Sequence, residues 1–466
     1  MPPALPQAGT ARTARTARTA RPSRPARPLP GALPLVGHAP WLALRPLDFV
    51  EKLRDHGGVV RFMVGPRPAY MVSTGELMKE LLITHQSKFE KGGPLFEQAT
   101  KLLGNGLAAS NGEFHLRQRR LSQPAFHHAR MGLYARAALD AADAVSTTWR
   151  DGQVLELGPA LNDMTMDVLS RTLFSSLTAG AAAEIRRCLP ALVAGVGRRA
   201  FLPVEFVHKL PLPVNRREAE ALRSLYEVVD AIIADYRSGD LDQGDLLSML
   251  MLARDEETGE GMTTEQIHDE IRSMMVAGTE TSATLLLWAF QVLAARPDVE
   301  RRVHAELQEV LEGRPVGYED LPRLPYLGRV VQELLRMFPT GWILTRRATC
   351  EVDLGGWRIP EGADVFFSPY ALHRDPTVFA DPHRFDPDRW LPERAAAVPR
   401  HAYLPFGAGV RKCIGESLAY AEITLILASL MGRWRMRSVT GRPPRPVAGS
   451  TLRPRESRMR VEARRP

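Results

Sequence analysis

The stretch from residue 402 to residue 432, AYLPFGAGVRKCIGESLAYAEITLILASLMG, constrains this chain more than any other. A glycine-rich, basic loop in it carries one cysteine, Cys413, and leads directly into an apolar segment of helical length. Glycine lets such a loop turn tightly and approach a ligand closely. We expect the charges of Arg411 and Lys412, and the positive end of the helix that follows, to lower the pKa of the thiol. That would favour the thiolate, which is the form that binds metals.

A free cysteine taken alone is most often a small buried hydrophobe. Here Phe406, Gly409, Arg411, Cys413 and Gly415 follow the order Phe-x-x-Gly-x-Arg-x-Cys-x-Gly, which fixes five positions in ten residues. This pattern resembles the haem-binding loop of the cytochrome P450 family, the haem-thiolate monooxygenases. The resemblance implies that Cys413 is the axial ligand of a haem b iron. It also implies that Phe406 packs beside the haem and that Arg411 contacts a haem propionate.

Composition sets the outer limits of the fold. The chain has 466 residues, of which 44% are hydrophobic, so it can bury a large core. Its three cysteines, Cys188, Cys350 and Cys413, lie far apart, so we expect no disulfide framework, which fits the cytoplasm. No apolar run reaches about 18 residues, so no transmembrane helix is expected. The net charge of +8 lies largely near the two ends, so we expect no nucleic-acid partner.

Residues 1–30 are predicted to form a disordered tail. An Ala-Arg-Thr repeat is followed by RPSRPARPLP, and this dense arginine and proline leaves few apolar residues for a core. The composition resembles a transit peptide, but no apolar segment of a secretory signal follows. We interpret residues 1–30 as a solvated tail and residues 31–466 as one domain.

His115 and Arg119 are four residues apart and should share one face of a helix. By the resemblance, this helix covers the haem and both side chains bind propionates; taken alone, the pattern indicates a solvated basic face. Arg117 and Arg120 point to other faces. Together with Arg130 and Lys412, which also flank the expected haem-contacting elements, these two arginines are interpreted as a basic surface for an acidic partner or, alternatively, as an ordinary solvated face.

Residues 59–73 alternate like a β-hairpin with Gly65-Pro66 at the turn, and residues 127–260 read as a succession of helices. A long helix is predicted to begin at Thr263, where a capping-box pattern with Gln266 occurs, and to end before Pro297.

The middle of this helix reads Ala-Gly-Thr-Glu-Thr-Ser over residues 277–282. Glycine costs a helix about 1 kcal/mol, and a hydroxyl that bonds back to a carbonyl tends to bend it. The segment is either a tolerated weak spot or an opened helix. It resembles the oxygen-activation motif of the family, which implies that the helix opens around Gly278 beside the cofactor. By the same resemblance, Glu280 is the acid and Thr281 the alcohol that deliver protons to dioxygen.

Glu333 and Arg336 form a Glu-x-x-Arg pair one helical turn apart, and most such pairs lie on the surface and contribute little. With Arg389 of the later segment HRFDPDRW they resemble the buried charge-paired cluster behind the haem of the family, a structural element. Arg346 fits the propionate-binding arginine of the family, and the neighbouring Arg347 is the alternative.

The resemblance covers about residues 33–458 and implies a mostly α single domain with small β-sheets. It implies a monooxygenase that inserts one atom of O₂ into an apolar molecule with electrons from NAD(P)H. The sequence has no flavin-binding glycine motif and no Fe–S cysteine cluster, so a ferredoxin and its reductase are the expected donors. We expect a cytoplasmic monomer.

Two other classes remain open at this point: a peroxide-using or isomerising haem enzyme, which would not need the acid and alcohol, and a non-catalytic haem sensor or carrier. The sequence pattern from LTRRA to FDPDRWLPER is similar to terpene-oxidising actinobacterial members, which favours a sesquiterpene-like terpenoid over a fatty acid, steroid or polyketide. An apolar substrate also fits the candidate pocket residues, Phe201, Phe206, Ala277, Trp342, Ile343 and Leu344.

Overall fold

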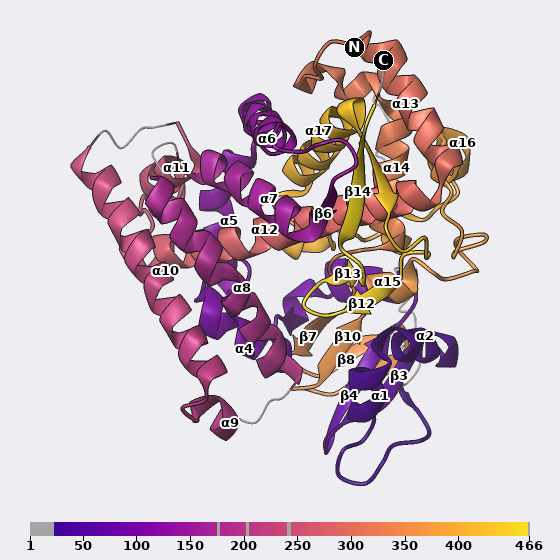
Figure 1. Cartoon of the computed structure of the whole chain (residues 1–466). Helices are drawn as coiled ribbons and strands as arrows, with labels where there is room; N and C mark the ends of the chain where they lie inside the picture. The colour runs from indigo at the N-terminus through magenta and orange to yellow at the C-terminus, as the bar shows by residue number, and fades with distance from the viewer. Residues whose placement is uncertain (1–22, 175–177, 202–204, 240–243, 465–466) are drawn as a thin grey trace, which may run out of the picture.

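The computed structural model describes residues 23–174, 178–201, 205–239 and 244–464. It confirms a mostly helical fold with small sheets, in which the strand-rich part occupies the lower right of Figure 1 and the long helices the rest. The helices that frame the site are α5 (Gly112–Ser122), α7 (Leu157–Leu173), α12 (Thr264–Ala295), α14 (Pro325–Met337) and α17 (Glu416–Arg433).

The other helices are α1 (Ala39–Leu44), α2 (Pro46–His56), α3 (Gly75–Lys79), α4 (Pro94–Leu103), α6 (Met131–Ser146), α8 (Ala179–Phe201), α9 (Glu205–Lys209), α10 (Pro213–Ser238), α11 (Leu246–Leu252), α13 (Pro297–Leu311), α15 (Pro369–Leu372) and α16 (Pro392–Ala395). Among the residues described above, no helix is long and apolar enough to cross a membrane.

The largest sheet has six strands in the order β2-β3-β4-β10-β7-β5. Its strands are β2 (Arg27–Pro28), β3 (Val59–Val64), β4 (Arg67–Val72), β5 (Phe89–Glu90), β7 (Leu344–Ala348) and β10 (Asp364–Phe367). The smaller sheets contain β1 (Arg24–Pro25), β6 (Val154–Glu156), β8 (Val352–Leu354), β9 (Trp357–Ile359), β11 (Trp434–Ser438), β12 (Pro446–Ala448), β13 (Leu452–Pro454) and β14 (Arg458–Ala463). The predicted hairpin is confirmed as β3 and β4, with Gly65 at φ 60° in the turn.

The predicted long helix is confirmed as α12, which has 32 residues. It begins with the expected capping box, because Thr263 Oγ1 accepts from the Gln266 N–H at 3.2 Å and the Gln266 side chain accepts from the Thr263 N–H at 3.0 Å. Residues 282–293 are buried on every face of the helix, so this half lies in the main core and fixes the helix firmly.

The expected tail ends earlier than position 30. Residues 24–25 form β1, which pairs in parallel with β9, and residues 27–28 form β2, which pairs in parallel with β3. Neighbouring strands thus hold a proline-rich segment that composition alone predicts to be disordered. Residues 1–22 of the expected tail lie outside the described residues.

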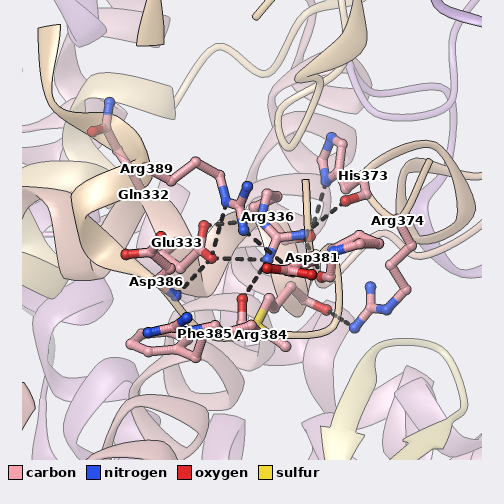
Figure 2. A network of polar contacts seen from close by, with 12 residues as sticks. Gln332, Glu333, Arg336, His373, Arg374, Asp381, Arg384, Phe385, Asp386 and Arg389 are labelled. Atoms are coloured by element: carbon pink, nitrogen blue, oxygen red, sulfur yellow. Dashed lines mark hydrogen bonds and ion pairs between the residues drawn. The ribbon is translucent and has the colours of Figure 1, made fainter. Parts of the chain in front are cut away.

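A buried network around Glu333 joins α14 to the segment that precedes the Cys413 loop (Figure 2). Arg336 Nε and Nη2 each donate to the Glu333 carboxylate at 2.8 Å, and both side chains are fully buried. Arg389 Nε donates to the same carboxylate at 3.5 Å, and the Trp390 indole N–H and the Asp386 N–H each donate at 3.0 Å.

The arginines of this Glu333 network also bind backbone carbonyls. Arg336 donates to His373 and Pro382 at 2.8 Å and to Arg384 at 3.2 Å, and Arg389 donates to Ala380 at 2.7 Å. Buried charges are tolerated where their hydrogen-bonding groups are satisfied in this way. The network therefore ties three segments of chain together.

Replacement Glu333→Ala is expected to leave two buried arginines without their carboxylate. Removing one partner of a buried pair costs about 3–5 kcal/mol, a large part of a total stability of roughly 5–15 kcal/mol. Urea unfolding and the yield of folded protein measure the loss. The exposed Glu309→Ala on α13 is the matched control and should unfold like wild type. An unchanged unfolding midpoint in Glu333→Ala would contradict a structural role for the network.

Candidate functional site

Cys413 lies between a short 3-10 turn, Gly409–Arg411, and the first residue of α17. The Cys413 N–H donates to the Phe406 carbonyl at 2.9 Å, which closes the loop, and the half-buried Phe406 side chain packs against the main core. Gly409 has φ 68°, and a Cβ there would lie 1.9 Å from the Leu82 carbonyl oxygen. Only glycine permits this approach, so the loop conformation depends on it.

The Cys413 thiol is surrounded by protein yet keeps accessible surface. Burial is the largest influence on its pKa and raises it; the Gly415 N–H bonded to sulfur, Arg119 and Lys412 only partly offset this. The prediction that the loop lowers the pKa of the free thiol is therefore wrong. Lys412 pairs with Glu416, and Arg411 donates elsewhere. A thiolate at this position needs a cation at the sulfur itself, as a bound metal provides.

Four cationic side chains from separate elements gather beside this loop: Lys91, Arg119, Arg346 and Arg411. Their mutual effects on pKa show how close they lie. Burial and the charge of Arg411 lower the pKa of Arg346 to about 9, and burial lowers that of Arg411 to about 10. The pKa of Lys91 lies well below its usual value because of burial and the charges of Arg411, Arg346 and Arg119.

The members of this cationic cluster donate mainly to backbone carbonyls. Arg119 donates to Lys412 at 2.8 Å, Arg346 to Thr345 at 2.8 Å and Arg411 to Ser110 at 2.6 Å. Lys91 donates to Ala108 at 2.5 Å. Within the described part of the chain, none of the four forms an ion pair with a carboxylate.

His115 completes this group from α5. It is buried, with Nε2 3.4 Å from the Val410 carbonyl and Nδ1 3.4 Å from Ser110 Oγ. Burial, with the charges of Arg411 and Lys91, lowers the pKa of His115 to about 4, so the ring is neutral at pH 7. His115 therefore adds a hydrogen-bonding group without adding charge.

Buried cations that lack carboxylate partners are costly to hold in a fold. The cluster therefore fits an anionic group, and the two propionates of haem match both its charge and its place beside a cysteine. Of the two candidate arginines on β7, Arg346 belongs to the cluster. Arg347 instead binds Asp364 and Glu97, both at 2.8 Å.

Sequence reasoning missed Lys91. The residue follows β5, whose pairing with β7 sets Glu90 opposite Arg347 and so brings Lys91 near Arg346. No local motif marks this position, and only the two glycines that follow it indicate an unusual backbone.

The hexapeptide at 277–282 does not open α12, which is helical throughout. Instead the Thr281 hydroxyl bonds back to the Ala277 carbonyl at 2.6 Å. Ala277 is exposed, although the neighbouring turns are buried. A Cβ at Gly278 would lie 3.1 Å from Leu169 of α7, and the expected place of Gly278 beside the cofactor stays a prediction. The glycine therefore permits close packing of α12 on α7.

The Glu280 carboxylate is held by the loop that joins β12 and β13. Glu280 Oε1 accepts from Ser450 Oγ at 3.1 Å and from Thr451 Oγ1 at 2.8 Å. Glu280 also lines a cavity of about 560 Å³ between α7, α8 and this loop. The acid of the pair thus faces this cavity, while the Thr281 hydroxyl bonds to its own helix.

The candidate pocket residues divide into three groups. Ala277, Ile343 and Leu344 keep accessible surface. Trp342 does not line a pocket, because it is buried in the core and its indole N–H donates to the Gly449 carbonyl at 2.9 Å. The side chains of Phe201 and Phe206 lie outside the described residues.

The expected basic surface is not formed as a free patch. Arg120 pairs with Asp255 at 2.9 Å, Arg117 donates to the Gly261 carbonyl at 2.8 Å, and Arg130 donates to Gly244 at 3.3 Å. A groove of about 1140 Å³ lies instead along the Cys413 loop. Its charged lining residues are Lys79, Arg329, Arg400, Lys412 and Glu416.

The similarities to known proteins agree with this geometry. A sequence model of the family described as Cytochrome P450 matches residues 27–459. Cyclooctatin synthase of Streptomyces melanosporofaciens is 46% identical over 91% of each chain. Cyclooctat-9-en-7-ol 5-monooxygenase of the same organism is 43% identical over 88% of this chain and 90% of its own.

Pentalenene oxygenase of Streptomyces avermitilis is 41% identical over 94% of this chain and 97% of its own. Among solved structures, a cytochrome P450DA haem domain superposes with a TM-score of 0.86 at 27% identity. That match covers 96% of this chain and 99% of the haem domain.

His115 makes the cofactor-free protein sensitive to acid. Its pKa is depressed in the fold, so the unfolded chain binds the proton first and stability falls as the pH drops from about 6.5 to about 4. His115→Gln should remove about 2 kcal/mol of the stability difference between pH 7 and pH 5, as measured by urea unfolding. The exposed His383→Gln is the control, and an equal flattening in both variants would contradict this assignment.

Proposed function

Because the chain belongs to the cytochrome P450 family and is a haem-dependent monooxygenase, we propose that Cys413 supplies the axial thiolate of its haem b iron. The observation that carries this proposal is the cationic cluster without carboxylate partners beside the Cys413 loop. In this proposal Arg119, Arg346, Arg411, His115 and Lys91 hold the propionates. When bound, the haem supplies the chemistry that activates O₂.

The Gly415 N–H and the buried loop define the environment of the sulfur. A backbone donor to a ligand sulfur withdraws charge from it and tunes the metal. We propose the same role here for the bond from Gly415, which already lowers the pKa of the Cys413 thiol. The bond from the Cys413 N–H to the Phe406 carbonyl closes the loop and so helps to hold this donor in place.

We propose a terpenoid as the substrate. Two similar proteins are named for the oxygenation of cyclooctat-9-en-7-ol and of pentalenene. The residues expected to face the substrate, Ala277, Ile343 and Leu344, are apolar and keep accessible surface. An apolar wall of this kind favours a hydrocarbon skeleton. Among terpenoids, we propose a substrate with a sesquiterpene-like skeleton.

We propose that Thr281 Oγ1 presents a proton to the dioxygen substrate and that the Glu280 carboxylate replenishes it. The cavity of about 560 Å³ beside Glu280 gives the carboxylate a route to water. Ser450 and Thr451 orient the carboxylate through their hydroxyl groups. The presence of both acid and alcohol favours use of O₂ over use of peroxide.

Replacement Cys413→Ser tests the ligand. Wild type should show the red-shifted Soret band of a thiolate-bound ferrous–CO complex, and the variant should lose it. The buried Cys188→Ser and the partly buried Cys350→Ser are matched controls that should keep the band. Retention of the band in Cys413→Ser would transfer the ligand role to another cysteine and end this proposal. Terpenes added to wild type should shift the spin state of the iron.

Replacement Thr281→Ala should keep haem and substrate binding but separate NAD(P)H oxidation from product formation, with peroxide released. Positioned proton transfer contributes about 10²- to 10⁴-fold, which bounds the expected loss of product. Thr279→Ala is the matched control, because that hydroxyl is buried and bonds to the Met275 carbonyl on another face of α12. If NAD(P)H oxidation stays coupled to product formation equally well in both variants, another group delivers the proton.

We propose that electrons reach the haem from NAD(P)H through a cytoplasmic ferredoxin and its reductase, and that the chain acts as a monomer. The groove along the Cys413 loop is the proposed docking place, since four of its five charged lining residues are basic. Such a surface steers an acidic partner and speeds association.

Reversal of charge by Lys79→Glu with Arg400→Glu should slow haem reduction by ferredoxin and flatten its dependence on ionic strength. Stopped-flow reduction at several salt concentrations measures this, and substrate affinity should stay unchanged. Arg216→Glu with Arg217→Glu, exposed on α10, is the matched control. If both pairs of substitutions have the same effect, the groove is not the docking place.

A further inference from the structure

Five large apolar side chains are exposed within twelve residues near the start of the described chain. Together they form what we call the apolar edge: Leu33 (48% exposed), Leu35 (89%), Val36 (44%), Trp41 (50%) and Leu44 (80%). The other ten exposed large apolar side chains of the described residues are spread over the remaining chain. Such a concentration marks an interaction surface more often than chance exposure does.

Backbone bonding builds the first half of the apolar edge. Leu33 and Gly37 exchange N–H to carbonyl bonds of 3.0 and 2.9 Å, so residues 33–37 form a closed loop. Leu35 at its tip has φ 65°, a conformation that non-glycine residues rarely adopt. Gly37 anchors the loop on β3, where a Cβ would lie 2.6 Å from Met63. The fold therefore holds Leu35 outward in a defined, strained position.

Helix α1 supplies the second half. Trp41 and Leu44 are three residues apart and share one exposed face of the helix, while Leu42 packs against the main core. The helix is thus seated on the protein by one side chain and presents two large apolar groups on another face. In Figure 1 the indigo loop before α1 forms the lower edge of the molecule, away from α12 and α17.

The charge around the apolar edge is mainly positive, although α2, which packs beside α1, carries Asp48, Glu51 and Asp55 as well as Lys52 and Arg54. Residues 23–47 and 59–72 contain five arginines and no acidic residue. The Gly65 N–H donates to the Val36 carbonyl at 3.1 Å, which brings the turn that carries Arg67 beside the loop. Arg45, Arg61 and Arg67 are exposed, and none of them forms an ion pair within the described part of the chain.

The preceding sequence extends this charge. Arginines stand at every third position from 12 to 27, and the first acidic residue of the chain is Asp48. Residues 12–22 of this run lie outside the described residues. The composition of this segment provides a run of positive charge immediately before the apolar edge.

We propose that the apolar edge and the arginines around it bind the surface of an anionic lipid membrane. Apolar side chains alone, or basic residues alone, give weak and reversible attachment, whereas the two together give stable attachment. Each arginine near such a surface contributes about fivefold to partitioning. In this proposal the attachment is to the membrane surface, through side chains of the apolar edge.

Co-sedimentation of the haem-loaded, full-length protein with lipid vesicles tests this proposal. Wild type should bind vesicles that contain about 30% phosphatidylglycerol in phosphatidylcholine, and should bind much less at high salt or to pure phosphatidylcholine. Leu35→Asp with Leu44→Asp, and separately Arg45→Gln with Arg67→Gln, should each weaken binding about tenfold or more. Leu133→Asp with Val439→Asp, which alters exposed apolar residues elsewhere, is the matched control and should bind like wild type.

Trp41 supplies a second measurement. Vesicles with brominated lipid should quench part of the tryptophan fluorescence of wild type, and Trp41→Phe should lose that part. Wild type that stays in solution with anionic vesicles overturns the proposal, and so does equal loss of binding in the control. A concentration-dependent dimer that Leu35→Asp with Leu44→Asp abolishes would assign the edge to a second copy, and binding only to ferredoxin would assign it to an acidic protein. None of these measurements depends on turnover.

Discussion

The buried carboxylate of Glu333 connects the rigid core to the reactive loop. It neutralises Arg336, whose backbone carbonyl accepts from His373 Nδ1 at 3.1 Å. The other ring nitrogen, Nε2, accepts from the Leu404 N–H at 2.8 Å, two residues before Phe406. Burial lowers the pKa of His373 to about 3, so the ring stays neutral and can accept at one nitrogen while it donates at the other. A continuous chain of hydrogen bonds thus runs from α14 to the Cys413 loop.

The two charged regions of the molecule differ in the groups that compensate their cations. In the Glu333 network, buried arginines find a carboxylate and backbone carbonyls. In the cationic cluster, the buried Arg346 and the half-buried Arg119, Arg411 and Lys91 donate to carbonyl oxygens only, and burial lowers their pKa. The first arrangement is complete within the chain. The second fits a ligand that carries negative charge, as the propionate-binding role proposed for it requires.

Local patterns in the sequence were enough for much of the fold, since the capping box of α12, the β3–β4 turn and the Glu333–Arg336 spacing depend on neighbours in the chain. Features that depend on distant partners were missed or wrong. Burial, not the flanking charges, dominates the pKa of Cys413. Gly278 meets Leu169 of α7, Arg120 meets Asp255, and Lys91 joins the site through the pairing of β5 with β7. None of these contacts leaves a local signal.

The loop between β12 and β13 has a consequence for the order of biosynthesis. Glu280 belongs to α12, but the hydroxyls that hold its carboxylate come from Ser450 and Thr451, which follow it by 170 and 171 residues. The indole N–H of Trp288 likewise donates to the carbonyl of Leu452, which also lies far along the sequence. A nascent chain can therefore complete α12 and even the Cys413 loop before this acid is oriented. The orientation of this carboxylate is therefore a late step of folding, which requires the loop between β12 and β13 to dock on α12.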